Sequence, residues 1–345
     1  MRLLLKILGD LIFIPVVVFC LLNSSLVIYG IRMGYGQVEI VYNARELEDV
    51  YSDAQVDSKV KEKLKLIEAI REFAFDSIGL KRNDNYTTYY DQKGKRLLYV
   101  VTASKPFELV PYEWSFPIIG DVPYKGFFVE EKANAERDRL KAEGWDTDIG
   151  GASGWSTLGW FRDPVLSNML ETDEGDLAEL IIHELTHGTI YVNGDANYNE
   201  NLATFIGVNG AAWYLTSRYG KDSKQYQDYL HANSEDDIRT QFMLSSAVYL
   251  DSIYKAIKTS CNENCKHQIK QTAFDTIVAR AEALGLANDS LFHVRIEKRL
   301  NESGNAVFLH YTRYSGKQTD FMDDFKKVQF NLRRFIEEIM ERIQI

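Results

Sequence analysis

The stretch AELIIHELTHGTIYVNGDANYNENLATF, residues Ala178–Phe205, carries the most informative residue spacing in the chain. His183 and His187 are four residues apart, Glu184 directly follows the first histidine, and Glu200 lies thirteen residues after the second. Residues four apart share one face of an α-helix, so both imidazoles can reach the same point. The apolar residues that surround the histidines predict that this helix is largely buried.

A zinc site with three protein ligands fits this spacing. Catalytic zinc takes two histidines and a carboxylate and keeps a further position open. Glu200 opens the next apolar-periodic segment, and the turn before it leaves enough chain for that segment to fold back, so we predict Glu200 as the third ligand. Asp195, in the turn, is the alternative. The metzincin spacing is excluded, because Asn193 and Ile190 stand where it places a histidine and a glycine.

Glu184 is the predicted general base, because zinc lowers the pKa of water to about 7 and an adjacent glutamate can take the proton. The alternative is a helix that carries two histidines by chance. Burying two histidines and a glutamate with neither metal nor partners is costly, however. A second carboxylate also arrives where a third ligand is needed. The sequence therefore predicts Zn²⁺ held by His183, His187 and Glu200.

The composition favours a folded protein and disfavours a nucleic-acid partner. The 345 residues are 45% hydrophobic, enough for one large core or a core with a small appendage. The formal net charge is -10 and no basic stripe is present, whereas phosphate binding needs clustered lysine and arginine. Cys261 and Cys265 do not match a zinc knuckle. They form a disulfide in an oxidising compartment or are two surface thiols.

The N-terminus, MRLLLKILGDLIFIPVVVFCLLNSSLVIYGIRMGYGQ, predicts a membrane segment. The 25-residue span Ile7–Ile31 carries a single charge and is long enough to cross a bilayer core of about 30 Å. We predict that residues 1–32 form a transmembrane helix whose basic start stays in the cytoplasm. A cleaved signal peptide and a lipoprotein modified at Cys20 are the alternatives. Each places residues 33–345 outside the cytoplasm.

Periodicity predicts an α+β fold in which strands precede helices. Residues 96–103 are expected to form a buried strand, and the proline-containing stretch 111–128 a loop with short strands. The glycine-rich segment 150–160 is the candidate edge strand for pairing with a peptide substrate. Helical spacing covers residues 56–78, 131–144, 176–191, 199–215 and most of the chain from about 223. The expected unit is a zincin-like catalytic domain with a mixed sheet, an edge strand before the HExxH helix and a mostly helical C-terminal half.

The HELTH and NENLATF motifs resemble those of gluzincin peptidases, which pair HExxH with a glutamate in an NE dipeptide on the following helix. The spacing is shorter than in thermolysin-like and alanyl-aminopeptidase-like enzymes, and the GAMEN-type exopeptidase motif of the latter is not in the sequence. A closer resemblance, over most of the chain, is to the bacterial family named "putative aminopeptidase". It rests on GQVEIVYNAREL (36–47), SFPIIGDVPYKGFF (115–128), GWSTLGWFRDPVLSNML (154–170), ELIIHELTHGTIYV (179–192), NENLATFIG (199–207) and GNAVFLHYTRY (304–314).

This resemblance implies an exported or membrane-anchored zinc peptidase, in the bacterial periplasm or on the cell-surface side. It also implies that Tyr314 donates a hydrogen bond to the oxyanion, with Tyr311 and His310 as alternatives. The expected function is hydrolysis of peptide bonds outside the cytoplasm. Two other functions stay open: a zinc-dependent amidase of the cell envelope and a non-catalytic zincin-fold scaffold at the membrane. The presence of Glu184 together with all three predicted ligands argues against the scaffold.

Overall fold

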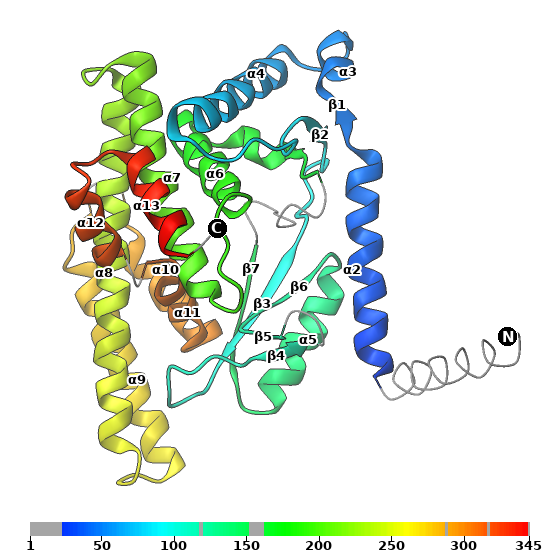
Figure 1. Ribbon diagram of the computed structural model, residues 1–345. Helices are drawn as coiled ribbons and strands as arrows, with labels where there is room; N and C mark the ends of the chain where they lie inside the picture. Colours follow the sequence, from blue (N-terminus) through cyan, green and yellow to red (C-terminus); the bar gives the residue numbers. More distant parts are fainter. Residues whose placement is uncertain (1–22, 117–119, 152–161, 287–288, 316–317, 344–345) are drawn as a thin grey trace, which may run out of the picture.

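Short strands occupy the N-terminal half of the chain and long helices the C-terminal half, as Figure 1 shows for the computed structural model. The structure describes residues 23–116, 120–151, 162–286, 289–315 and 318–343. Among the described residues every strand precedes α6 and only helices follow it, but α2, α3 and α4 come before most of the strands and α5 lies between two of them, so the predicted order of strands before helices is met only in part.

The first described helix, α2 (Ser24–Asn43), stands along one side of the molecule (Figure 1). It runs without a break through the predicted boundary between residues 32 and 33. Gly36 lets it pack closely, because a Cβ there would lie 2.2 Å from the Phe128 ring. Within the described residues, no helix is long and apolar enough to cross a membrane. Most of the predicted anchor, residues 1–22, lies outside the described part.

The segment after α2 forms α3 (Leu47–Ser52), α4 (Ser58–Phe73) and the π-helical turn η1 (Ala74–Ile78). Asp57 caps α4 by accepting a hydrogen bond from the Lys59 backbone N–H at 2.8 Å. Gly79, with φ +90°, ends the helical run in the left-handed conformation that glycine adopts most readily. The predicted helix over residues 56–78 is therefore confirmed as α4 and η1.

The strands form three small sheets. One is mixed, in the order β1-β2-β8, with β1 antiparallel and β8 parallel to β2. The second is antiparallel, in the order β6-β3-β7, and the third pairs β4 with β5. Their bounds are β1 (Arg45–Glu46), β2 (Thr88–Tyr90), β3 (Tyr99–Ser104), β4 (Trp114–Phe116), β5 (Gly120–Val122), β6 (Lys125–Phe127), β7 (Asp146–Gly151) and β8 (Val165–Leu166).

The helix α5 (Glu130–Ala142) covers the β6-β3-β7 sheet. Its Ala133 and Leu140 join Val101 and Ala103 of β3 in a small core. Gly144 follows the helix with φ +86°, the left-handed conformation in which a glycine commonly ends a helix. The strand β7 lies at the edge of this sheet, but residues 152–161, which hold most of the predicted substrate-pairing strand, lie outside the described residues.

The 3₁₀ turn η2 (Ser167–Glu171) leads into α6 (Glu174–His187), which packs against α7 (Ala196–Tyr219). Two glycines of α7 allow the close approach. A Cβ at Gly207 would lie 3.0 Å from the Glu179 carbonyl oxygen, and one at Gly210 would lie 3.0 Å from Ile182. Together with α4, this pair of helices forms the largest core.

The rest of the chain is helical: α8 (Lys224–Ile257), α9 (Glu263–Glu282), α10 (Phe292–Ser303), α11 (Ala306–Ser315), α12 (Gln318–Lys327) and α13 (Leu332–Arg342). The helices α8 to α11 share a second core, whereas α12 and α13 pack onto the core of α6 and α7. A disulfide joins Cys261 to Cys265 at the start of α9, which realises one of the two states expected for these cysteines.

One predicted boundary was wrong by several residues. The helix expected over residues 176–191 ends at His187, and residues 188–195 form the loop to α7. Gly194 in this loop has φ +80°, a conformation that does not continue a helix. The early stop leaves room for the chain to reverse before Glu200.

Candidate metal centre

Three side chains predicted as metal ligands converge where α6 meets α7. The Nε2 atoms of His183 and His187 are 3.2 Å apart. The Glu200 Oε2 atom lies 3.4 Å from Nε2 of His183 and 3.6 Å from Nε2 of His187. The structure therefore brings these donors together from two helices, as the spacing predicts.

The size of this triangle fits a zinc ion. Zinc bonds of about 2.0–2.1 Å in tetrahedral geometry place neighbouring ligand atoms about 3.3 Å apart. The three observed separations of 3.2, 3.4 and 3.6 Å bracket that value. Among the described residues, His183, His187 and Glu200 form the one group of three histidine, cysteine or carboxylate side chains close enough to share a metal ion.

The three donors are mostly withdrawn from solvent, with exposed side-chain fractions of 16% for His183, 7% for His187 and 21% for Glu200. Burial opposes the charge on Glu200, but the contacts with both imidazoles outweigh it and hold the pKa of Glu200 far below its usual range. Burial likewise opposes protonation of His183, yet Glu200 raises the pKa of that imidazole. A carboxylate that stays ionised between two imidazoles is a suitable donor set for a divalent cation.

The loop between the helices is fixed by Asn199, which places Glu200. The Asn199 Oδ1 atom accepts from the Val192 backbone N–H at 2.8 Å, and its Nδ2 donates to the Val192 carbonyl oxygen at 2.8 Å. Both contacts are made by a side chain that is 3% exposed. This clamp ties the first turn of α7 to the middle of the loop, and Asn199 directly precedes Glu200, the predicted third ligand.

Glu184 is half-buried on α6, next to the first histidine. Among the described residues its carboxylate has no hydrogen-bond or ion-pair partner. It is thus available to a small molecule at the cluster, which is what a general base requires.

Asp195, the alternative third ligand, has another role. Its carboxylate accepts from the Tyr198 backbone N–H at 2.9 Å and caps α7. It is not part of the cluster of three donors, so the choice of Glu200 over Asp195 agrees with the geometry.

Tyr314 is the predicted oxyanion donor, with Tyr311 and His310 as the alternatives. Tyr314 lies on α11, but its side chain lies outside the described part of the structure. Tyr311 is half-buried in the core of α8 to α11; burial raises its pKa, and its charged neighbours are arginines and Asp236. The exposed His310 packs edge to face against it at 5.5 Å. Neither alternative is part of the metal-ligand cluster.

Tyr86 is a residue near the site that the sequence did not indicate. Its side chain is fully buried, and its hydroxyl has no hydrogen-bond partner among the described residues. Burial raises its pKa well above the usual value, with Glu184 as the next contributor. Its φ of +60° is in the left-handed region, which is uncommon for a residue with a side chain. No periodicity or motif marks this tyrosine in the sequence.

A second half-buried carboxyl, that of Glu179, also lies on α6 near the first histidine. Glu179 accepts a hydrogen bond from the Tyr229 hydroxyl of α8 at 2.7 Å. Burial raises the pKa of Glu179 to about 7, although this hydrogen bond acts in the opposite direction. Glu179 lies one helical turn before His183, so the same spacing rule that paired the histidines could have marked it.

One comparison with known proteins identifies a family. The model of the family described as "Putative aminopeptidase" matches residues 28–344. The chain belongs to this family. That membership supports a peptidase, and therefore a hydrolase, and the match covers the metal-ligand cluster together with nearly all of the described fold. No curated protein and no solved structure matches the chain significantly.

Proposed function

We propose that this member of the "Putative aminopeptidase" family is a zinc-dependent peptidase with His183, His187 and Glu200 as ligands. The observation that carries the proposal is the triangle of donor atoms, with sides of 3.2, 3.4 and 3.6 Å. The family supports peptide hydrolysis, and the donor set supports zinc.

The roles of the side chains follow from their positions. Zinc, when bound, supplies Lewis-acid chemistry: it polarises a peptide carbonyl and makes water acidic enough to be deprotonated near neutral pH. Glu184, whose carboxylate has no hydrogen-bond partner among the described residues, takes the proton from water and returns it to the leaving amine. His183 and His187 present their Nε2 atoms from α6, while Glu200 approaches from α7. The Asn199 clamp holds the first turn of α7 against the preceding loop and so helps to fix the position of Glu200.

We place the catalytic domain outside the cytoplasm, attached to the membrane through residues 1–32, with a peptide as substrate. The apolar run Ile7–Ile31 and the Cys261–Cys265 disulfide support this location, since disulfides persist in oxidising compartments.

Zinc content tests the proposal directly. The full-length chain, purified in detergent and supplied with zinc, is expected to hold about one zinc ion per chain. His187→Ala and Glu200→Ala should each lose it, whereas His231→Ala, an exposed histidine on α8, should keep it. A folded wild-type protein without zinc would refute the metal centre. Zinc retained by Glu200→Ala alone would move the third ligand to another residue, with Asp195 next.

A panel of substrates tests the reaction. Peptides with free N-termini, the same peptides acetylated, and cell-wall peptides separate an aminopeptidase, an endopeptidase and an envelope amidase. Zinc-loaded wild type should cleave a peptide that Glu184→Gln, which keeps all three ligands, does not. A zinc-loaded protein that cleaves only the cell-wall amide would favour the amidase.

A further inference from the structure

A second site lies apart from the metal centre, in a cavity of about 360 Å³ between α2 and the β6–α5 unit. Its size is within the usual range for pockets that bind small ligands. Four basic side chains and one carboxylate line it, together with a group of aromatic and aliphatic residues. This excess of positive charge stands out in a chain whose net charge is -10.

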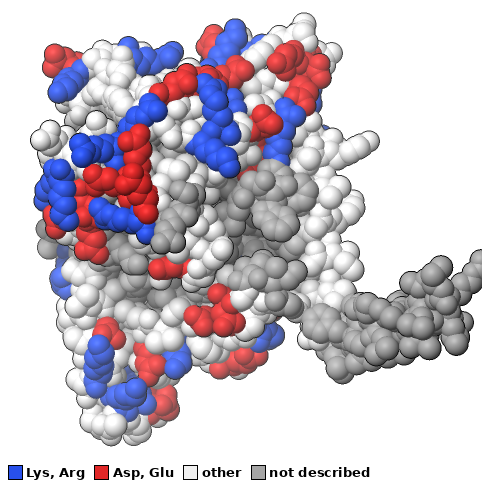
Figure 2. Space-filling model, in the orientation of Figure 1, with Lys and Arg blue, Asp and Glu red and all other residues white. Residues whose placement is uncertain are grey.

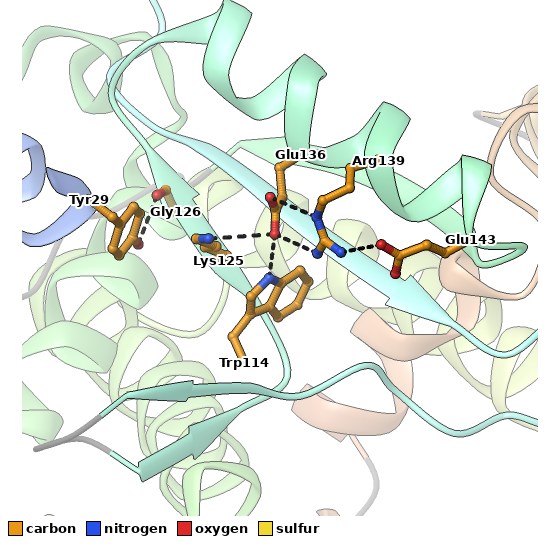
Figure 3. A network of polar contacts seen from close by, with 7 residues as sticks. All are labelled: Tyr29, Trp114, Lys125, Gly126, Glu136, Arg139 and Glu143. Atoms are coloured by element: carbon orange, nitrogen blue, oxygen red, sulfur yellow. Dashed lines mark hydrogen bonds and ion pairs between the residues drawn. The ribbon is translucent and has the colours of Figure 1, made fainter. Parts of the chain in front are cut away.

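The one carboxylate is already neutralised, as Figure 3 shows. Glu136 accepts from the Trp114 indole N–H at 2.7 Å and from Arg139 at 3.0 Å, and Lys125 lies 3.5 Å away. Burial opposes its charge, but Arg139 and Trp114 hold the pKa of Glu136 below its usual range. The network therefore fixes the cavity wall and leaves no free negative charge in it.

Two cations at the cavity remain unpaired. Arg32 comes from α2 and Lys132 from the first turn of α5, and both are exposed. Within the described residues, neither side chain has a hydrogen-bond or ion-pair partner. An anionic group that enters the cavity would meet two charges that no carboxylate of the described residues satisfies.

Apart from Ser25, the remaining lining is apolar or aromatic. Tyr29 and Met33 from α2 face Phe127 and Phe128. Tyr29 is held in place by its hydroxyl, which donates to the Gly126 carbonyl oxygen at 3.0 Å (Figure 3). The Lys125 ammonium lies 4.8 Å from the centre of the Tyr29 ring, so that cation is partly engaged by the aromatic face. The cavity thus offers an anion-binding side and an apolar side.

The same helix also carries a stripe of exposed uncharged side chains at positions that do not line the cavity. Ile31, Tyr35 and Tyr42 are 66%, 71% and 85% exposed, and Ile28 and Val38 continue the same stripe. In Figure 2 the strip along α2 is almost free of charge, whereas the α3–α4 and α12–α13 surfaces carry interspersed charges. The stripe continues from the apolar run Ile7–Ile31, so the cavity opens beside the part of the chain best suited to contact lipid.

We propose that this cavity binds the headgroup of an anionic phospholipid. Its phosphate would pair with Arg32 and Lys132, and the glycerol and first acyl carbons would lie on Tyr29, Met33 and Phe127. Arginine and lysine bind phosphate oxygens through charge-assisted hydrogen bonds. The proposal is independent of the zinc chemistry, because no lining residue belongs to the metal-ligand cluster.

The test uses full-length protein in a non-ionic detergent and three soluble probes: dihexanoyl phosphatidylglycerol, dihexanoyl phosphatidylcholine and inorganic phosphate. Binding is followed by native mass spectrometry and by the shift in melting temperature. Phosphatidylglycerol is expected to bind at least tenfold more tightly than either of the other probes. The double variant Arg32→Gln with Lys132→Gln should weaken the binding of phosphatidylglycerol on the order of thirtyfold. Each cation then contributes about one order of magnitude or less.

The matched control is Lys59→Gln with Lys221→Gln, which removes the same charge from two exposed lysines away from the cavity and should bind like wild type. If the double variant is less stable than wild type in the absence of lipid, Arg32→Gln alone replaces it in the test. This single variant is expected to weaken lipid binding several-fold. Unchanged binding in the cavity variants would overturn the proposal. Equal binding of phosphatidylglycerol and phosphatidylcholine, or phosphate bound as tightly as the lipid, would do the same.

Discussion

Replacing Glu179 with glutamine should stabilise the metal-free protein at alkaline pH and leave it nearly unchanged at acidic pH. Burial raises the pKa of this carboxyl from 4.5 to about 7. A carboxyl with a raised pKa binds a proton more tightly in the folded state than in the unfolded state. The free energy of unfolding therefore falls as the pH rises from 4.5 to about 7, and is then constant.

The magnitude follows from this shift. Each pKa unit corresponds to about 1.4 kcal/mol, so ionising Glu179 costs at most about 3 kcal/mol of stability above pH 7. Glutamine cannot ionise, yet its side-chain oxygen can still accept from the Tyr229 hydroxyl. Glu179→Gln should thus melt on the order of 5 °C above wild type at pH 8 and within about 1 °C of it at pH 5.

Thermal unfolding of chelator-treated protein at pH 5, 6, 7 and 8 measures the effect, because a bound cation would itself lower the pKa of a nearby carboxyl. Glu131→Gln, on the exposed start of α5, is the matched control and should change no melting temperature. If Glu179→Gln shifted the melting temperature equally at pH 5 and pH 8, burial of an ionisable carboxyl would not be the cause, and the reasoning would be refuted.

Three further substitutions test the site. Glu184→Gln should keep its zinc but lose about 10²- to 10⁴-fold in peptide hydrolysis, and unchanged turnover would exclude it as the base. Gly207→Ala should destabilise the protein by about 1–3 kcal/mol in chemical unfolding, since its Cβ would lie 3.0 Å from a carbonyl oxygen; a neutral result would show that α6 and α7 adjust freely. Tyr86→Phe should raise stability by about 1 kcal/mol, because it removes a buried unpaired hydroxyl, and a loss would reveal a partner.

The metal-ligand cluster was the most predictable part of the molecule. His183 and His187 share a face by helical spacing alone, and the polar turn before Glu200 signals a chain reversal. The sequence did not indicate why the two helices come close enough. That depends on Gly207 and Gly210, whose absent side chains let α7 approach α6, and on the Asn199 clamp.

Residues that act through long-range packing could not be predicted. Tyr86 lies in a polar stretch without periodicity, and it meets the surroundings of Glu184 only through the fold. Tyr229 reaches Glu179 across fifty residues of sequence. The wall of the cavity beside α2 could not be predicted either, because Trp114 and Lys125 meet Glu136 only after β4, β6 and α5 have packed. The zincin fold and the transmembrane anchor stay predictions, the second because it rests largely on residues 1–22.

The three donors and Glu184 all lie within the 18 residues from His183 to Glu200. Such a short segment closes at low entropic cost, because loop-closure entropy rises with the number of residues enclosed. The centre is therefore complete once α6 and α7 meet, which requires none of the helices that follow. During synthesis this hairpin leaves the ribosome before α8 to α13, so an ion captured there would favour the hairpin while the rest of the chain is still being made.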